Sequence, residues 1–575
     1  MPHTPNFDAK VKAILDTTTP GERVCPVSGK TWELTHEYLE RCRKWNVPPS
    51  KLHPFTRMKL LASWGAGVDL WYKPHMLTGK PILTCSHPDV PGAVITDAEY
   101  WQKDWGEEHS MDVNPSLSFF NQMQELNQKV PRAAFDSDTS ENCVGGGYSH
   151  SVNTLMLFGT YEAKDSFYVF RNKTVDRVFD AVCLEQCQDS FSCAMSVRLN
   201  KCIQCFDSLD CINCQFCFDV RNCEHCFCST NLRRRKYVFM NEQLSQEDYE
   251  KRMSEINLSC TSEFDAWREK FIEILRTDTV FPEHSNINVQ NTNGEYIIDG
   301  LNASGYFMTG AKDVRDGWFI FGGENMESCV IAASAQDCYY SCVSTRSRDL
   351  KFSFVVYDSQ SCEFSIKLNN CENCFGCIGL KRKKFHIFNK PYSEEDYWRW
   401  VDEIKCAMLD RGEYGDFMPT WLSPWPAQMS FASVAAPLTD DELKNLNTPS
   451  YDPVQGMRFA PETSVPMKDV VEVPDCIAGV GEEWTRVQFE DKEEQRRYNV
   501  SARELKVRKE KGYPFPRRHY RARLIELFRQ INSPERENVA CAKCGKEIEV
   551  AVHRMFPNRR VYCYDDYLAY IQERN

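Results

Sequence analysis

The C-terminal part of the chain holds the residues whose spacing best suits a metal ion. Cys541 and Cys544 form a Cys-x-x-Cys pair followed by Gly-Lys, and glycine permits the tight turn that presents two thiolates to one ion. Cys563 and Asp566 are spaced like a second pair. Three thiolates and a carboxylate suit zinc, with His553 as the competing fourth ligand. The spacing predicts a zinc site at Cys541, Cys544, Cys563 and Asp566; the alternative is a ribbon that folds without metal.

A larger group of cysteines lies in the middle of the chain. Residues 211–217 and 371–377 both read Cys-x-x-Cys-x-x-Cys, which matches the first part of a ferredoxin spacing, but the fourth Cys-Pro is missing after both. Every third position from Val175 to Leu232, and again from Cys329 to Leu380, is Cys, Ser, Ala, Val or Leu, with Met at none of them. Since Ala, Val and Leu cannot bind metal, we expect these thiols to fill a core, because reduced Cys behaves as a small hydrophobe. Zinc or an iron–sulfur cluster in this region is the alternative. The core-filling cysteines that we predict are Cys205, Cys211, Cys214, Cys217, Cys223, Cys371, Cys374 and Cys377.

A period of three fits neither a helix nor a long strand. It is typical of a chain that turns a corner every few residues and points one small side chain inward at each step, as in a stacked β-solenoid. A bundle of polyproline-II segments has the same period but needs more glycine. Asp and Asn often precede the inward residue, and these types tolerate left-handed corners. Such corners are predicted at Asp207, Asp210, Asn213, Asp219, Asn222, Asn370 and Asn373.

The repeat region occurs twice. Residues 220–256 align without gaps to residues 368–404, and in each copy the triplets give way to a basic tetrad, an apolar strand and a Ser-x-Glu-Asp-Tyr helix start. Ser245 and Ser393 are suitable N-caps for these helices. The outward aromatic residues, Phe216 and Phe354 among them, either offer a partner surface or pack under covering segments.

The outer segments are a second duplicated pair. His53 and Arg57 match His519 and Arg523 at one constant offset, which also aligns Gly79-Lys80 with Gly545-Lys546. The fold class that we predict is mainly β with α: two tandem β-solenoid lobes, each ending in a hairpin and helix cap, flanked by degenerate zinc-ribbon-like α+β modules. The predicted domains are an N-terminal module (1–130), lobe 1 (131–275), lobe 2 (276–430), an extended connector (431–481) and a C-terminal module (482–575).

The N-terminal module has lost most of the ligand types. His75 and Thr78 stand where Cys541 and Cys544 stand in the C-terminal copy, with Thr96 and Glu99 near the second pair. A further knuckle, formed by Cys25 and Ser28 with His53 and Thr56, keeps one cysteine of four. We therefore expect no zinc in this module.

The motif "CFGCIGLKRKKFHIFNKPYSEEDY" (374–397), together with the Cys-x-x-Cys runs, resembles a family of uncharacterised cysteine-rich proteins common in small-genome uncultivated bacteria. The resemblance covers nearly the whole chain. It implies zinc-ribbon ends and a β-solenoid middle, and it implies no established activity, so it supplies no catalytic residues. Positions 28, 53, 56, 75, 78 and 566 depart from the cysteine pattern of the family.

Composition and charge limit the classes of function. The net charge is −13, which argues against general affinity for nucleic acid or anionic membranes. Without a signal peptide or a run of 18 apolar residues, we expect a cytoplasmic protein with no membrane span, whose 28 cysteines stay reduced. Local basic clusters could still bind anions or nucleic acid, and these are Arg233, Arg234, Arg235, Lys236, Lys381, Arg382, Lys383, Lys384, Arg517 and Arg518.

The function that we predict is a non-enzymatic scaffold that binds a protein partner or itself through the solenoid surface. The first alternative is a nucleic-acid-binding zinc-ribbon protein. The second is a polysaccharide-active β-solenoid enzyme, although no P-loop, G-x-S-x-G or H-E-x-x-H motif is present.

Overall fold

The triplet regions form parallel sheets whose register advances by twelve residues. In the computed structural model, Cys205 pairs with Cys217 and Cys217 with Ser229, and the same step relates Leu350, Cys362 and Cys374. The structure describes residues 3–137, 139–169, 175–176, 179, 184–185, 196–197, 203–320, 322–452, 455–461 and 464–575. Most of the first triplet register between Val178 and Cys202 lies outside these residues. The fold is mixed, with helices and several separate sheets.

Corners in the left-handed region recur at every third residue, which is how a chain with period three can coil. The predicted corners are confirmed: Asp207, Asp210 and Asn213 have φ of 49°, 51° and 53°, and the four others also have positive φ. The corners fall just before the inward residues, so each coil points one small side chain inward per step. Bulky residues at other corners, such as Val343 and Val355, also adopt positive φ, which costs roughly 1–2 kcal/mol per residue for types other than Gly, Asn and Asp.

The corner at Arg382 allows a direct test of this conformational cost. Arg382 is exposed and has φ of 55°, whereas Asn370 holds the equivalent corner one coil earlier. Replacing Arg382 with Asn should therefore raise the free energy of unfolding by roughly 0.5–1 kcal/mol, measured by urea denaturation. Lys384→Asn, at an exposed position two residues later, is the control and should give no gain. An Arg382→Asn protein no more stable than wild type would argue against the corner.

The chain divides into two compact units, each assembled from two separated segments. One consists of residues 1–136 with 286–459, and the other of residues 137–285 with 460–575. Each unit therefore combines one repeat region with one outer module. The predicted domain boundaries stay predictions. Residues 432–435 and 440–445, inside the predicted extended connector, are helical.

The first unit holds the longest sheet, a 12-stranded one formed by its repeat region. Its helices are α1 (Pro5–Thr17), α2 (His36–Trp45), α3 (Pro54–Ala62), α4 (Asp97–Gln102), α5 (Phe119–Lys129), α8 (Glu394–Arg411), α9 (Ala432–Ala435) and α10 (Asp440–Asn445). The strands of its outer module are β1 (Gly21–Val24), β2 (Thr31–Leu34), β3 (Trp71–Pro74), β4 (Pro81–Thr84), β5 (Val94–Ile95) and β6 (Arg132–Ala133). Those of its repeat region are β19 (Asn293–Ile298), β20 (Ser304–Thr309), β21 (Lys312–Gly317), β22 (Glu324–Ala333), β23 (Gln336–Thr345), β24 (Arg348–Lys351), β25 (Phe354–Tyr357), β26 (Gln360–Glu363), β27 (Ile366–Asn369), β28 (Glu372–Phe375), β29 (Lys384–Ile387) and β30 (Lys390–Pro391).

The second unit repeats this plan in the residues that the structure describes. Its helices are α6 (Gln246–Ser254), α7 (Thr261–Thr277), α11 (Ala502–Lys511), α12 (Tyr520–Arg529) and α13 (Tyr564–Arg574). Its strands are β7 (Val144–Ser149), β8 (Leu155–Tyr161), β9 (Ala163–Lys164), β10 (Val175–Asp176), β11 (Leu184–Glu185), β12 (Ser196–Val197), β13 (Ile203–Phe206), β14 (Gln215–Arg221), β15 (Glu224–Arg233), β16 (Lys236–Phe239), β17 (Glu242–Gln243), β18 (Phe281–Pro282), β31 (Phe489–Asp491), β32 (Arg496–Tyr498), β33 (Asn532–Ala540), β34 (Glu547–His553) and β35 (Val561–Tyr562).

Each repeat region ends in the same cap. An antiparallel pair, β16–β17 in one unit and β29–β30 in the other, leads into a helix. The predicted N-caps are confirmed, since Ser245 accepts a hydrogen bond from the backbone N–H of Asp248, and Ser393 does the same for Asp396. The capping helices begin with acidic residues, as the helix dipole favours.

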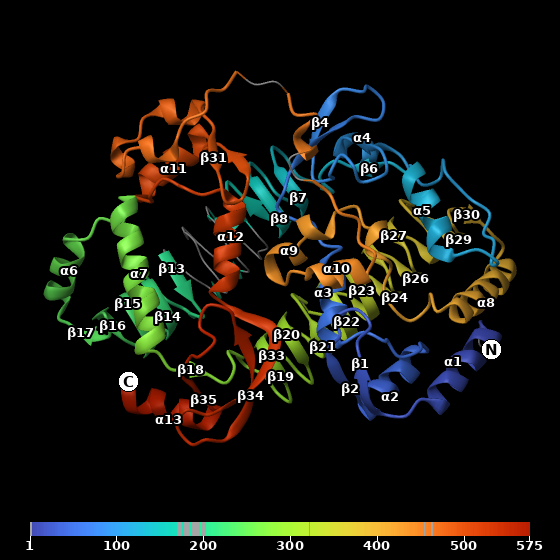
Figure 1. The fold of residues 1–575 in the computed structure, drawn as a ribbon, viewed down its shortest axis with the longest axis horizontal. Helices are drawn as coiled ribbons and strands as arrows, with labels where there is room; N and C mark the ends of the chain where they lie inside the picture. Colours follow the sequence, from blue (N-terminus) through green and yellow to red (C-terminus); the bar gives the residue numbers. More distant parts are fainter. Residues whose placement is uncertain are drawn as a thin grey trace. The chain divides into compact units, whose positions relative to one another are not determined.

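The outward aromatic residues named above are buried under covering segments. Helix α7 lies along β14 and β15 (Figure 1), and its Phe264 ring packs against Phe216 at 5.4 Å between centroids. In the first unit, Trp64, just after α3, packs on Phe354 at 5.2 Å. These aromatic faces hold each outer layer on its repeat region, so they do not form an open partner surface.

One disulfide corrects the expectation that every cysteine stays reduced. Cys260, the N-cap of α7, is bonded to Cys476, which precedes the 3₁₀ turn Ile477–Gly479. The two residues also form an isolated antiparallel bridge. The sequence offered no signal for this bond, because the partners are 216 residues apart.

Candidate metal centre

The four predicted ligands meet where a hairpin faces the start of a helix. Cys541 and Cys544 lie in the turn between β33 and β34, which is closed by a hydrogen bond of 2.9 Å from the Gly545 N–H to the Cys541 carbonyl. Gly545 has φ of 78°, a conformation that favours glycine. Cys563 is the N-cap of α13 and Asp566 lies in its first turn. Two rigid local structures therefore present two ligands each.

The spacing of the four ligand atoms suits an ion with tetrahedral coordination. The four atoms all lie within 4.8 Å of one another. Asp566 Oδ2 is 3.2 Å from both Cys541 Sγ and Cys563 Sγ, and Cys544 Sγ is 3.9 Å from Cys563 Sγ. Zinc bound at its usual distances separates such ligand atoms by about 3.6–3.8 Å. The cluster can hold a metal ion with small adjustments, and its thiolate-rich donor set suits zinc.

In this geometry the pKa values of the four ligands shift in different directions. Hydrogen bonds from the thiols, with that of Cys544 having the largest effect, lower the pKa of Asp566. The carboxylate is therefore charged and accepts these hydrogen bonds. Desolvation raises the pKa of Cys563 to about 12, and the hydrogen bond to Asp566 adds to the increase. Desolvation also acts on Cys541, but backbone N–H groups of Cys544 and Cys563 outweigh it and lower that pKa. Zinc must displace the thiol protons, so its affinity rises with pH.

His553, the competing fourth ligand in the sequence, is not part of the cluster. It ends β34 and is buried, its ring packed against Phe556 at 4.9 Å, and its Nδ1 accepts a hydrogen bond from the Phe556 N–H. Desolvation, followed by the charge of Arg559, lowers the pKa of His553 to about 3. Asp566 completes the set instead, because the first turn of α13 carries it to the thiols.

The buried histidine predicts acid sensitivity. In the unfolded chain His553 takes up a proton below about pH 6.5, whereas in the folded chain it stays neutral down to about pH 3. The unfolded state therefore binds more protons between these values, and stability falls as the pH decreases. The contribution from pH 6.5 to 4.5 is about 2–3 kcal/mol.

His553→Gln tests this, since glutamine can still accept from the Phe556 N–H but does not titrate. Between pH 7 and pH 4.5, the free energy of unfolding measured in urea should fall by about 2–3 kcal/mol less for the variant than for wild type. Equal losses in the two proteins would mean that His553 is protonated in the folded state.

No family model, curated protein or solved structure matches the chain. The centre is therefore interpreted from its own geometry.

The same hairpin and helix arrangement occurs in the N-terminal module with other residues. The turn after β3 brings His75 and Thr78 toward Thr96 and Glu99 at the start of α4. His75 Nε2 lies 2.7 Å from Glu99 Oε2, and His75 Nδ1 accepts from the Thr78 N–H. Hydrogen bonds thus connect the side chains at this corner directly.

Cys25 and Ser28 form a similar corner with His53 and Thr56. The Ser28 N–H donates to Cys25 Sγ at 3.5 Å, and Thr56 donates to Ser28 Oγ at 3.1 Å. Among the residues that the structure describes, neither N-terminal corner contains three metal ligands within 4.8 Å of one another.

A fourth hairpin turn that faces the start of a helix was not predicted from the sequence. The turn between β31 and β32 begins at Asp491, and the carboxylate accepts hydrogen bonds from the N–H of His519, the N-cap of α12, and from Arg518 Nε. Asp491 corresponds to Cys25, and His519 to His53, at the constant offset between the two outer modules. Because an aspartate stands where the first module has a cysteine, only an alignment of the two modules at this offset could have predicted the turn.

All eight cysteines predicted to fill the core are buried. Cys371 Sγ donates to the carbonyls two residues before it and nine residues after it, at 3.4 Å each. Ser347 occupies the same column two coils earlier and donates to the equivalent carbonyls at 3.0 Å. Cys and Ser can replace each other at these positions because both are small side chains that donate hydrogen bonds to the same two backbone carbonyls.

The thiols of the repeat are poorly suited to bind metal. Within the described part of the chain, no three sulfur atoms of the repeat lie within 4.8 Å of one another. The pKa values of the repeat thiols differ: burial raises that of Cys329 to about 12, whereas hydrogen bonds from Cys214 and Cys223 lower that of Cys226 to about 4. It is therefore the spacing of the sulfur atoms, and not their protonation, that makes them unsuitable.

Most of the basic candidates are engaged inside their own unit. Arg233 forms an ion pair with buried Asp219 at 2.8 Å, Lys236 with Glu224 at 2.8 Å, and Arg235 donates to the Asn575 carbonyl oxygen. The equivalent tetrad behaves alike: Lys381 donates to the Tyr100 carbonyl, Lys383 pairs with Glu107, and Lys384 pairs with Glu372. Arg234 and Arg382 are the exposed left-handed corners of their tetrads.

The remaining two basic candidates serve the C-terminal module. Arg517 donates to the carbonyls of Val470 and Val473 at 2.7 and 3.1 Å, and Arg518 pairs with Asp491 at 2.7 Å. Among the described residues, no helix is long and apolar enough to cross a membrane.

Proposed function

We propose that the protein is a non-enzymatic scaffold whose two repeat regions are β-solenoid lobes and whose C-terminal module is held by one zinc ion. The lobes offer a long surface to a protein partner or to a second copy of the chain. The family resemblance of the 374–397 motif fits this proposal and supplies no activity.

The observation that carries the proposal is the closed donor set at the metal centre. Structural zinc sites use four protein ligands, whereas catalytic sites keep one position open for water or substrate. Cys541, Cys544, Cys563 and Asp566 are four ligands converging on one point. Zinc there would tie α13 to the β33–β34 hairpin and thereby stiffen the module.

An exposed ladder of polar side chains is the surface that best suits a partner. We define the ladder by the first residues of five successive coils, Gln336, Arg348, Gln360, Glu372 and Lys384, of which Glu372 is partly buried and the other four are exposed. Arg348 donates to Gln360 at 3.1 Å, and Lys384 pairs with Glu372 at 3.0 Å. These side chains are held in register by the sheet beneath them, so a partner meets an ordered surface.

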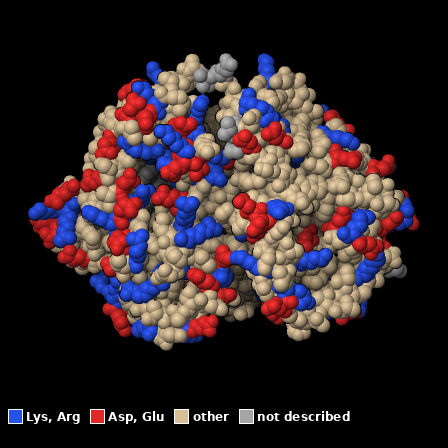
Figure 2. All heavy atoms as spheres, in the orientation of Figure 1, with Lys and Arg blue, Asp and Glu red and all other residues tan. Residues whose placement is uncertain are grey.

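Nucleic-acid binding is the weaker proposal. Engaged Arg and Lys side chains must give up internal partners before they can contact phosphate. On the face shown in Figure 2, acidic and basic side chains are interspersed, without one large basic patch. Fluorescence anisotropy with labelled RNA and DNA in low salt tests this function; salt-sensitive binding would favour it over the scaffold.

The scaffold proposal is tested by crosslinking the full chain in its host cells and rebuilding each captured complex, or the self-associated form, from purified protein. Charge reversal at Arg348 and Lys384 together should weaken assembly at least tenfold, whereas Arg276→Glu, exposed on α7, should not. The proposal would be contradicted if the charge reversal left the affinity of every complex unchanged, or if the chain stayed monomeric and captured no partner.

A further inference from the structure

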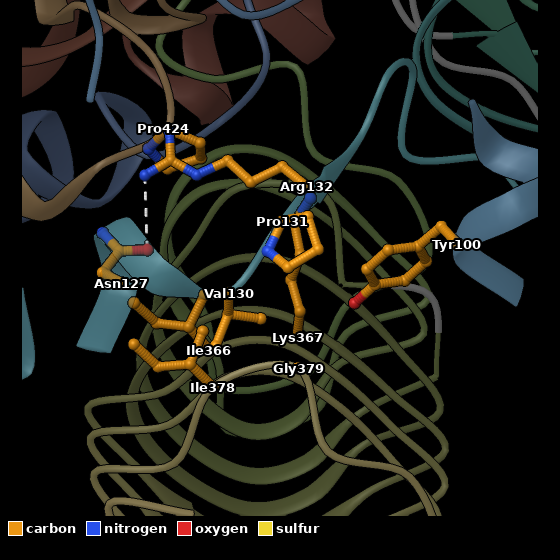
Figure 3. Close-up of a pocket in the computed structure, with 10 residues that line it drawn as sticks. All are labelled: Tyr100, Asn127, Val130, Pro131, Arg132, Ile366, Lys367, Ile378, Gly379 and Pro424. Carbon is orange, nitrogen blue, oxygen red and sulfur yellow. Dashed lines mark hydrogen bonds between the residues drawn. The ribbon is translucent and has the colours of Figure 1, made fainter. Parts of the chain in front are cut away.

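A small cavity lies at the end of the repeat region in the first unit. Figure 3 shows Tyr100, Arg132 and Pro424 around it, with Ile366 and Ile378 of adjacent coils beneath. The space within it accommodates about one water-sized group. Its walls combine apolar groups with four polar side chains, those of Tyr100, Asn127, Arg132 and Lys367.

The Arg132 guanidinium is buried but only partly satisfied. Arg132 is in β6, which pairs with β5, and the residue is 6% exposed. Its Nη2 donates to Asn127 Oδ1 at 3.2 Å, whereas its Nη1 has no hydrogen-bond partner. Gly92, with φ of 108°, lies directly against the group, and a Cβ there would come within 3.4 Å of the Arg132 Cζ. The backbone thus makes room for a guanidinium whose second nitrogen is left without an acceptor.

Among the described residues, the two other buried arginines, Arg57 and Arg508, each face a carboxylate, and so does the partly buried Arg233. Arg57 pairs with Asp316, Arg233 with Asp219, and Arg508 with Glu504. Within the part of the chain that the structure describes, Arg132 makes no ion pair, and Lys367, which lines the same cavity, pairs with Asp136. An isolated buried charge is costly, so a compensating anion is required.

A second buried basic group, outside the cavity lining, lies within electrostatic range of Arg132. Lys73 is buried, and its Nζ donates to the Val90 carbonyl at 2.6 Å. Desolvation lowers the pKa of Lys73 to about 7, with the charge of Arg132 as the next cause. Asp89 also acts on Lys73, but it is already paired with Arg458. Desolvation likewise lowers the pKa of Arg132, to about 10.

We propose that the cavity binds a small monovalent inorganic anion of the chloride class, which accepts a hydrogen bond from Arg132 Nη1. The size of the cavity matches a monatomic ion, and the apolar groups in its walls suit a weakly hydrated halide. A water molecule would satisfy the N–H group but leave the buried charge uncompensated. The ion would fix β6 and α5 against the final coils of the repeat.

Crystals of the full chain soaked in sodium bromide test the site directly. Anomalous scattering should show bromide within hydrogen-bonding distance of Arg132 Nη1. Water alone at that position, in crystals that bind bromide elsewhere or nowhere, overturns the proposal. This measurement uses the wild-type protein, so it does not depend on any variant folding.

Unfolding in solution gives an independent test. At constant ionic strength, replacing gluconate with chloride should stabilise the chain, and above the dissociation constant each tenfold rise in chloride should raise the folded-to-unfolded ratio tenfold. Arg132→Gln should abolish this dependence, whereas Arg458→Gln, a partly exposed residue, should retain it. The same chloride dependence in wild type and Arg132→Gln, or none in wild type, overturns the proposal.

Discussion

Replacing Glu504 with Ala should lower the free energy of unfolding by about 3–5 kcal/mol, because it leaves a buried charge without its partner. Glu504 and Arg508 lie one turn apart on α11, both fully buried, with Arg508 Nε 2.8 Å from Glu504 Oε1. The Tyr168 hydroxyl donates to the other carboxylate oxygen at 2.8 Å. The alanine variant removes the acceptor of both groups at once.

Urea denaturation measures this loss, and Glu510→Ala is the matched control, since Glu510 is exposed on the same helix. The control should change stability by less than about 0.5 kcal/mol. Replacing Glu504 and Arg508 together with methionine should cost much less than the single alanine change, because no buried charge remains. A loss below about 1 kcal/mol for Glu504→Ala would show that water reaches the pair.

Removing zinc from the C-terminal module should unfold that module locally. Structural zinc contributes about 10–16 kcal/mol of apparent binding free energy in small zinc domains at neutral pH. Hydrogen exchange should therefore accelerate across β33, β34 and α13 on chelation or in Cys563→Ser. Cys371→Ser is the control, because serine occupies the same column at Ser347 and Ser359 and makes the same hydrogen bonds.

The pH dependence of zinc binding follows from the protonated thiols. Each proton released on binding makes the apparent affinity rise about tenfold per pH unit below the thiol pKa. Competition with a chromophoric chelator between pH 6 and 8 measures this slope. Zinc affinity that does not change with pH, or exchange that is unaltered after chelation, would remove the structural role of the ion.

The local geometry of the repeat could be predicted because period three imposes it. Asp207 and Asn370 adopt the left-handed corners that their types favour, and Ser245 and Ser393 cap the helices that follow. The metal cluster was also accessible, because cysteine pairs with a glycine turn keep a recognisable spacing.

Long-range partners could not be predicted. The sequence does not reveal that residues 1–136 pack with 286–459, nor that Cys260 meets Cys476. Each depends on contacts between segments that share no pattern. The turn at Asp491 was not predicted for a different reason. It contains no cysteine pair, and its side chains form hydrogen bonds directly with the neighbouring segment.

The metal content of the purified full-length chain tests the central claim most directly. Elemental mass spectrometry should find about one zinc per chain, lost in Cys563→Ser and retained in Cys371→Ser. Several zinc or iron atoms per chain, diminished by Cys371→Ser, would contradict the account in which the thiols of the repeat pack and donate to backbone carbonyls.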